Sequence, residues 1–325
     1  MAVQHPALAR LAPAAGRLTL GIEMPLDNDL GEGTRRRLQE QGRPSGIPDL
    51  AEHVKRAQLA DRLGFKALWL RDVPLFDPLQ FGDAGTVFEI FTHLGHLAAT
   101  TEQAVLATAA VVLPLREPLL VAKAAATVDA LSGGRMLLGL ASGDRAVEYP
   151  LFGRDHAKRG EAFREGVATL RAAWQRGPLE LPAAGLERDR LLEVLPKPVR
   201  PAGIPLAVAG AAQQSTEWIA ENVDASLNYP RDLGALGLKT RQWREVAGDK
   251  PYLTPLMLAL QEDPDAPVTP IRLGISAGRN TLVEHLGAMA GLGVAHVFLN
   301  FRTNDRPVEE MLHEVAEEVL PHFHD

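Results

Sequence analysis

The segment Gly210–Thr216, with the sequence GAAQQST, joins a predicted strand to a predicted helix. Small side chains let the backbone approach an anion, and a helix N-terminus offers unpaired N–H groups and a partial positive charge. We therefore expect a phosphate group to bind here. The alternative is a tight turn in which the serine hydroxyl only caps the helix. The residues of this candidate phosphate site are Gly210, Ala211, Ala212, Gln214 and Ser215.

A second candidate anion site follows the predicted strand Met136–Ala141. Ser142 and Gly143 form a small turn there, and the guanidinium of Arg145 can pair with a phosphate. The alternative is a surface turn in which Asp144 and Arg145 are simply solvated.

Other reactive groups are scarce in the places where chemistry is expected. The chain has no cysteine, no G-x-S-x-G elbow, no GxxxxGK[ST] loop, and no histidine pair with metal-ligand spacing and a carboxylate partner. We expect no metal site and regard the histidines as structural or surface residues. A site so poor in acids, bases and ligands indicates that a bound cofactor supplies the reactivity.

Strand and helix candidates alternate along the chain, as periodicity and capping signals indicate. The predicted strands are Leu18–Ile22, Lys66–Leu70, Val105–Val112, Met136–Ala141, Pro205–Ala209, Ala225–Leu227, Leu253–Leu260 and Ala295–Leu299. The main predicted helices are Asp49–Leu63, Thr86–Ala99, Pro118–Leu131, Arg159–Trp174, Gln213–Glu221, Arg279–Leu292 and Pro307–Leu320. Repeated βα units imply parallel strands, and eight such units predict an α/β fold, the (β/α)8 TIM barrel with loop insertions.

The rival fold is a doubly wound sheet, which usually carries a G-x-G-x-x-G turn after its first strand. Glu23-Met24-Pro25-Leu26 stands there instead. We expect a single barrel domain over residues 17–325, preceded by a flexible arm at 1–16. The expected insertions are Pro25–Pro48, Gly177–Gly203 and Gln261–Gly278.

Active sites of such barrels lie at the C-terminal ends of the strands. The residues that follow the predicted strands are Glu23-Met24, Arg71-Asp72, Ala109-Ala110, Ser142–Arg145, Gly210–Ser215, Asn228-Tyr229 and Asn300. We expect the functional site among them.

Composition narrows the function further. The formal net charge is −7, with 34 Lys and Arg against 41 Asp and Glu, and no basic run of the kind a nucleic-acid binder carries. The longest apolar run, Ala104–Leu115, is far shorter than the ~20 residues that span a bilayer. Since no secretion signal is evident either, we expect a cytoplasmic protein without nucleic-acid or membrane partners.

Several blocks, in order, resemble the bacterial luciferase-like flavin oxidoreductases. Residues Ala107–Gly143 read ATAAVVLPLREPLLVAKAAATVDALSGGRMLLGLASG, which is similar to that family around its third and fourth strands. Further matching blocks are LWLRD at Leu68–Asp72, GAAQQSTEWIAE at Gly210–Glu221 and the closing Glu317–Phe323.

The resemblance implies a (β/α)8 barrel that binds FMN or, in some branches, the deazaflavin F420. It also implies a homodimer and, for many members, reduced flavin supplied by a separate reductase and used with oxygen. Ala109-Ala110 matches the place where many members have a non-proline cis peptide behind the flavin ring. Ala211-Ala212 and Ser215 match the phosphate-holding turn.

Two positions depart from luciferase. Ser142 stands where luciferase has an arginine, and Arg145 or Arg71 can substitute for it. Arg71-Asp72 stands where luciferase has two histidines facing the flavin, so Arg71 can stabilise reduced flavin or orient an anionic substrate, or else form an ion pair with Asp72 or Glu23. The expected catalytic residues are Arg71 and Asp72. The expected cofactor-binding residues are Glu23, Ala109, Ala110, Ser142, Gly143, Arg145, Gly210, Ala211, Ala212, Gln214 and Ser215.

We therefore predict a flavin-dependent monooxygenase that uses reduced FMN and oxygen on a small organic substrate. The rivals are hydride transfer with FMN or F420 without oxygen insertion, a non-catalytic flavin-binding barrel, and a cofactor-free lyase or isomerase. The last would need a lysine or a carboxylate pair at the strand ends, and Lys66 and Lys123 lie at the wrong ends of their elements.

Overall fold

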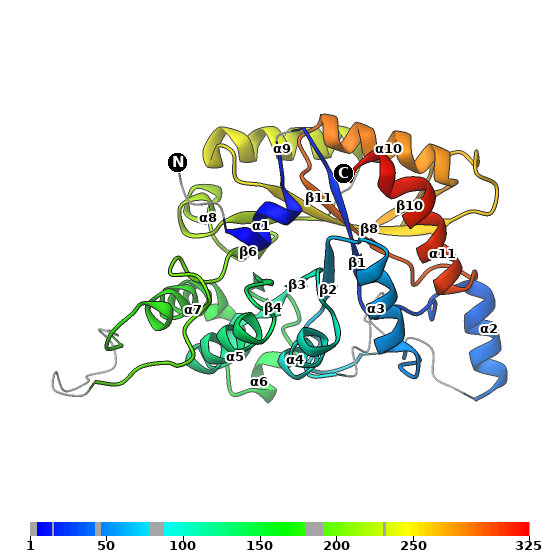
Figure 1. Ribbon diagram of the computed structural model, residues 1–325. Helices are drawn as coiled ribbons and strands as arrows, with labels where there is room; N and C mark the ends of the chain where they lie inside the picture. The colour runs from blue at the N-terminus through cyan, green and yellow to red at the C-terminus, as the bar shows by residue number, and fades with distance from the viewer. Residues whose placement is uncertain are drawn as a thin grey trace.

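Parallel strands close into a barrel in the computed structural model, which describes residues 5–14, 16–42, 47–77, 88–179, 191–229 and 232–324 (Figure 1). The eight barrel strands are β1 (Thr19–Glu23), β2 (Ala67–Leu70), β3 (Val105–Thr108), β5 (Met136–Ala141), β6 (Leu206–Ala209), β7 (Ala225–Leu227), β8 (Tyr252–Leu260) and β11 (His296–Asn300). Neighbours in this order pair, and β11 pairs with both β8 and β1, which closes the ring. The predicted TIM barrel is confirmed.

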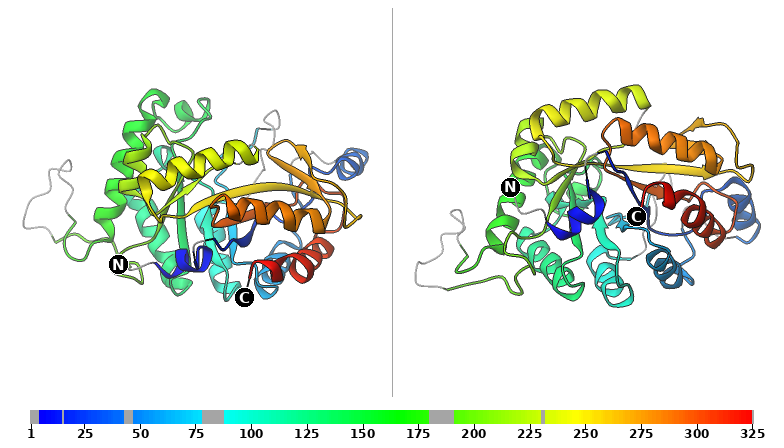
Figure 2. Two further views of the ribbon diagram at one scale, coloured as in Figure 1. Left: turned by 90° about the horizontal axis from the view of Figure 1, so that it is seen from above. Right: turned by 45° about the horizontal axis from the view of Figure 1, so that its top comes forward.

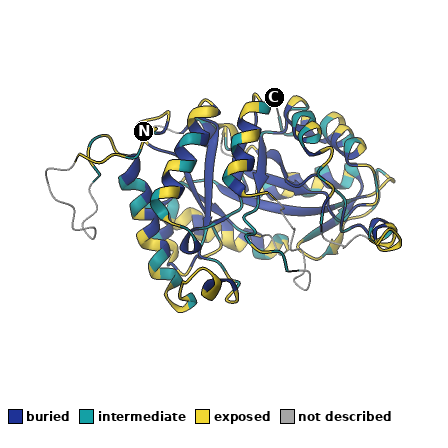
Figure 3. Ribbon diagram, turned by 90° about the horizontal axis from the view of Figure 1, so that it is seen from below, coloured by how far each residue is buried: buried dark blue, intermediate teal, exposed yellow. Residues whose placement is uncertain are grey.

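Helices surround the barrel and bury one face each against it, as the inward dark blue and outward yellow of Figure 3 show. The helices between and after barrel strands are α3 (His53–Arg62), α4 (Ile90–Thr100), α5 (Pro118–Leu131), α7 (Arg159–Trp174), α8 (Thr216–Asn222), α9 (Leu233–Ala247), α10 (Arg279–Gly291) and α11 (Val308–Glu314). Helical turns continue α11 through Val315–Val319 and Leu320–His322. Since each helix runs back along its strand, helix N-termini lie near the strand C-termini.

Several predicted elements differ in extent, and for two of them the backbone shows the reason. The strand expected over Val105–Val112 stops at Thr108 and resumes as β4 (Val111–Val112), which pairs with β5; the Ala109-Ala110 peptide between them is cis. The helix expected from Gln213 begins at Thr216, because Gln213 is left-handed, with φ 61°. The expected start of α4 at Thr86 lies outside the described residues.

The insertions contain elements that the sequence analysis does not predict. Helix α2 (Glu32–Glu40) lies on the side of the molecule away from α7 (Figures 1 and 2). It is fixed to the segment after β11, because Thr34 N donates to Asp305 Oδ1 at 2.9 Å. The insertion Gln261–Gly278 contains a hairpin of β9 (Thr269–Ile271) and β10 (Gly274–Ala277). Strand β10 pairs in parallel with the C-terminal part of β8, from Met257 to Leu260.

The N-terminal segment contains a packed helix, in contrast to the flexible arm expected for residues 1–16. Helix α1 (Pro6–Leu11) buries Ala7, Leu8 and Leu11 at exposures of 1%, 6% and 0%. These apolar positions form one helical face, which joins the core inside the barrel beside Trp69 and Phe298. Residues 1–4 and 15 lie outside the described part of the chain.

A hydrogen-bonded chain connects α1 to the barrel interior. Trp69 Nε1, which can only donate, gives its hydrogen bond to His296 Nε2 at 3.0 Å. The ring hydrogen therefore sits on Nδ1 and is donated to Thr19 Oγ1 at 2.7 Å, and Thr19 donates to the Leu11 carbonyl at 2.6 Å. Desolvation lowers the pKa of His296 to about 3, so the ring stays neutral. This histidine has a structural role.

A second histidine pair joins α3 to α4. His53 Nε2 and His93 Nε2 lie 2.6 Å apart, both rings are buried, and Phe88 packs edge-on against both. Burial lowers the pKa of His53 to about 4, assisted by Arg56, and the pKa of His93 to about 3, assisted by His53. Two charged rings would repel each other at this contact, and burial favours the neutral form of both.

This pair predicts acid sensitivity. A folded-state pKa below the unfolded value gives stability that is complete above about pH 6.5 and is lost as the pH falls towards 4. We expect His93→Gln to reduce the loss in unfolding free energy between pH 7 and pH 5 by about 1–2 kcal/mol. Urea unfolding at both pH values measures it. His313→Gln, at a half-exposed position, is the control, and equal losses in wild type and H93Q would contradict the prediction.

Candidate functional site

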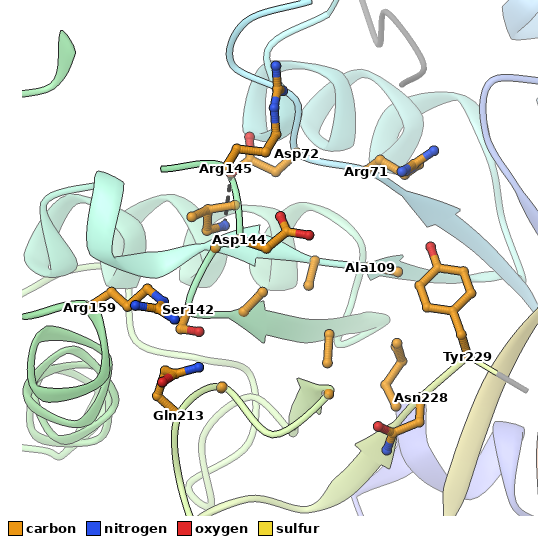
Figure 4. A pocket seen from close by; sticks show the side chains of 18 of the residues that line it. Arg71, Asp72, Ala109, Ser142, Asp144, Arg145, Arg159, Gln213, Asn228 and Tyr229 are labelled. Atoms are coloured by element: carbon orange, nitrogen blue, oxygen red, sulfur yellow. Dashed lines mark hydrogen bonds between the residues drawn. The ribbon is translucent and has the colours of Figure 1, made fainter. Parts of the chain in front are cut away.

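A cavity of about 640 Å³ opens at the C-terminal ends of the barrel strands (Figure 4). Most of the sequence-predicted site residues line it, namely Arg71, Asp72, Ala109, Ala110, Ser142, Gly143, Arg145, Gly210 and Ala212. Glu23, Ala211, Gln214 and Ser215 do not line it. The structure thus brings nine of the thirteen predicted site residues together around one cavity.

Small and apolar residues form the middle of the pocket. Ala109 and Ala110, joined by the cis peptide, lie between β3 and β4, and Ala141, Ala209 and Leu227 lie at the ends of β5, β6 and β7. None of these side chains is ionisable or reaches far from the backbone. The middle of the pocket can therefore take a flat apolar ring.

Gly143 stands where the backbone cannot accept a side chain. Its φ is +77°, and an added Cβ would lie 2.6 Å from Val112 Cγ1 and 2.8 Å from the Tyr149 hydroxyl oxygen. Tyr149 donates from that hydroxyl to the Ser142 carbonyl oxygen. The turn after β5 is thus fixed from behind, and Ser142 stays on the pocket surface.

Arg159, Ser142 and Gln213 gather at one end of the pocket (Figure 4). Arg159 is the first residue of α7, and its Nη1 donates to the His156 carbonyl at 3.0 Å. The turn after β6 is left-handed at Gly210, Ala212 and Gln213, with φ of 64°, 45° and 61°. Consecutive residues in such turns can direct backbone N–H groups towards an anion. This is the cationic end of the pocket.

Gln214 holds that turn against α7 and does not face the cavity. Its Oε1 accepts from Arg164 Nε and Nη2 at 3.1 and 3.0 Å, and its Nε2 donates to the Gly160 carbonyl at 2.8 Å. Ser215 caps α8 by accepting from Trp218 N at 3.2 Å, which is the capped-turn alternative. Both side chains support the turn, and their expected role in binding stays a prediction, since the Ser215 hydroxyl still has a hydrogen to donate.

Asp72 is fully engaged in structure. Its Oδ1 accepts from Arg116 Nη2 at 2.7 Å, and its Oδ2 accepts from Arg116 Nε at 2.9 Å and from Val112 N at 3.1 Å. Its side chain is 3% exposed. Because three donors hold this carboxylate in the framework, we interpret Asp72 as a positioning residue, and its expected catalytic role stays a prediction.

Arg145 is also engaged away from the pocket's cationic end. Its Nη1 lies 2.9 Å from Glu148 Oε1 and donates to the Leu75 carbonyl at 2.8 Å. Figure 4 shows the side chain directed away from Ser142 and Gln213. Arg145 therefore does not replace the arginine that luciferase has at the Ser142 position, and Arg159 is the cation beside that serine.

Polar side chains occupy the opposite end, across Ala109 from Arg159 (Figure 4). Arg71 Nε lies 3.6 Å from Glu23 Oε1, so the ion-pair alternative for Arg71 has Glu23 as partner, behind the pocket wall. Tyr229 and Asn228 follow β7 and line the cavity beside it. Desolvation, together with the charge of Glu23, raises the pKa of Tyr229 to about 12.

Sequence reasoning missed several lining residues. The sequence analysis places Gln213, Asn228 and Tyr229 at strand ends without assigning them a role, and it does not propose Arg159 or Lys239. One signal was available for Arg159: a helix that follows a strand begins at the strand's C-terminal side, so the first residue of Arg159–Trp174 must lie near the site. No comparable signal marks Lys239, which is in the unpredicted helix α9.

Within the described ranges, no three His, Asp or Glu side chains converge as ligands for a metal ion. Among the helices of the described residues, none has the length and apolar character that a membrane crossing requires.

Comparisons with known proteins agree with this geometry. The chain is 27% identical over 266 residues to pyrimidine monooxygenase RutA of Acinetobacter baylyi, covering 77% of this chain and 68% of that protein. It is 28% identical over 173 residues to the oxygenase component of flavin-dependent trigonelline monooxygenase from the same organism, covering 53% of this chain and 46% of the other. The fold superposes on monooxygenase RslO1 of Streptomyces bottropensis with TM-score 0.74, at 18% identity, over 94% and 100% of the two chains.

A family model described as luciferase-like monooxygenase matches residues 31–262. That range includes the cis peptide, the turn after β5, Arg159 and the turn after β6, which together form most of the pocket. The barrel topology and the ordered sequence blocks point the same way. The chain belongs to the luciferase-like monooxygenase family, whose members are flavin-dependent oxidoreductases.

Proposed function

We propose that the pocket binds FMN, with the phosphate at Arg159 and the Gln213 turn and the ring system over Ala109-Ala110. The observation that carries this proposal is the separation of a cationic end from a flat apolar middle in one cavity. A dianionic phosphate needs charge-assisted donors, and a planar ring needs a surface without protruding side chains. Both requirements have residues here that meet them.

The cofactor would supply the redox chemistry when bound, since reduced flavin passes electrons to oxygen. The chain's own residues then have three tasks. Arg159 and the left-handed turn hold the phosphate, Val112 and Leu227 keep water from the middle of the pocket, and Arg71 and Tyr229 orient the substrate. Excluding water matters because it prevents loss of reactive species before the substrate is oxidised.

We further propose that a separate reductase delivers the reduced flavin, as the name of the oxygenase-component relative suggests. A homodimer is proposed as well. Its support is an exposed apolar set on α5 and α6 (Glu148–Leu151) and just after, where Leu120, Leu151 and Phe152 are 66%, 69% and 41% exposed. Burying such side chains against a second copy would remove them from water.

Cofactor titration tests the proposal. We expect purified protein to quench FMN fluorescence with a micromolar Kd, and to consume oxygen in the presence of a flavin reductase, NADH and an accepted substrate. Riboflavin, which lacks the phosphate, should bind more weakly. Tight binding of F420 with no binding of FMN would instead favour the hydride-transfer alternative, and binding of neither cofactor would refute the proposal.

A further inference from the structure

The polar end of the pocket has a specific charge arrangement. Glu23 is the last residue of β1, its side chain is 4% exposed, and its Oε1 lies 3.6 Å from Arg71 Nε. Arg71 is the first residue after β2, and its side chain is 24% exposed on the pocket wall. A buried carboxylate directly behind a guanidinium cancels most of its charge at the pocket surface.

Two residues that line the cavity at the same end as Arg71, Tyr229 and Asn228, are uncharged. The Tyr229 phenol, with its pKa raised to about 12 by desolvation and by Glu23, remains a neutral hydrogen-bond donor at physiological pH. Asn228 Nδ2 donates to Ser226 Oγ at 2.7 Å. The carbonyl oxygen of the same side chain can accept a hydrogen bond from a ligand. Two further charged residues line the cavity at exposed positions, the negative Asp144 on the turn after β5 and the positive Lys239 on α9.

A carboxylate substrate would gain little here. It would need a buried cation whose charge is not offset, whereas Arg71 already faces Glu23, and the exposed Asp144 and Lys239 are of opposite sign and screened by solvent. A neutral carbonyl oxygen has no such requirement, since it needs only donors, and a guanidinium and a phenol supply them. An N–H next to that carbonyl could donate to Asn228.

We infer that this end of the pocket selects a neutral carbonyl compound, such as an amide, lactam or ketone, over a carboxylate, and that Glu23 sets this preference by compensating Arg71. Arg71 and Tyr229 donate to the carbonyl oxygen, and Glu23 acts as a positioning and charge-compensating residue behind them. This inference rests on the proposed function, because it assigns the substrate end of the same pocket.

Benzamide and benzoate test the inference, since they match in shape and differ by one charge. Binding is measured with FMN-loaded protein, as perturbation of the flavin absorption spectrum and by calorimetry. We expect the wild type to bind benzamide at least about tenfold more tightly than benzoate. In Glu23→Gln, which removes the negative charge 3.6 Å from Arg71, the benzamide-to-benzoate preference should fall by about tenfold or reverse.

Two further variants complete the test. Asp144→Asn also removes a negative charge from the pocket, but at an exposed position where solvent screens it. The benzamide-to-benzoate preference of this variant should therefore shift much less than that of E23Q. Tyr229→Phe, which removes only the hydroxyl, should weaken benzamide binding severalfold and leave FMN binding unchanged.

The outcomes separate the two levels of the argument. Failure of the wild type to bind FMN would refute the proposed function itself. Normal FMN binding with benzoate bound as tightly as benzamide, or with neither compound perturbing the flavin, would overturn the inference alone. So would an unchanged preference in folded E23Q, or, should E23Q not fold, unchanged benzamide binding in Y229F.

Discussion

Arg159→Met is expected to weaken FMN binding about a hundredfold while riboflavin binding stays nearly constant. Arg159 is the guanidinium beside Ser142 and Gln213 at the cationic end of the pocket. A phosphate loses a charge-assisted contact in the variant, and the long methionine side chain fills similar space. Fluorescence titration with both flavins gives the two affinities directly.

The matched control for this prediction is Arg154→Met. Arg154 is five residues before Arg159, its side chain is 45% exposed, and it lies 3.8 Å from Glu117. It does not line the pocket, so its replacement changes net charge equally without touching the proposed phosphate position. Equal losses of FMN affinity in the two variants would mean that only overall charge matters, and an equal loss for riboflavin in R159M would mean that the pocket itself is deformed.

Asp72→Asn is expected to lower the free energy of unfolding by about 3 kcal/mol. The substitution leaves Arg116, whose guanidinium is mostly withdrawn from water, with Glu89 as its remaining carboxylate partner at 3.1 Å. It also weakens the acceptor for Val112 N, two residues after the cis peptide. FMN affinity should therefore fall severalfold along with stability. Urea unfolding of the apoprotein and FMN titration measure the two effects.

A double-mutant cycle separates the ion pair from other effects of these substitutions. In Asp72→Asn with Arg116→Met, neither charge is left without its partner, so the total loss should be about 2 kcal/mol smaller than the sum of the two single losses. Additive losses would show that Asp72 and Arg116 do not stabilise each other. Glu52→Gln is a suitable control, because it removes one member of the exposed Lys55–Glu52 pair, which should contribute little.

The barrel could be predicted from the sequence because its strands are short apolar runs that are buried in the fold. Pro118–Leu131, Met136–Ala141, Arg159–Trp174 and Ala225–Leu227 have the predicted bounds. The sequence analysis does not predict helix α9, although it predicts β7 and β8 on either side of it. Helix α2 was missed because it lies in an insertion and buries only two residues, Thr34 and Leu38, so its apolar stripe is weak.

The site was predictable in location and less so in roles. The residues at the strand ends can be predicted from the sequence, but the hydrogen-bond partner of each polar side chain cannot. Asp72 depends on Arg116, 44 positions away, and Gln214 depends on Arg164, 50 positions away. The late start of α8 follows from left-handed Ala212 and Gln213, residue types that give no warning of that conformation. Such long-range partners decide whether a polar residue serves the ligand or the framework.

Helix α1 has a consequence for the order of assembly. It is translated before any barrel strand, yet the surfaces it rests on come from β2, β8 and β11, through Trp69, Leu253 and Phe298. The last of these leaves the ribosome some 290 residues after the helix. During synthesis helix α1 therefore stays undocked until the barrel strands have closed, and its docking would indicate that the barrel is complete.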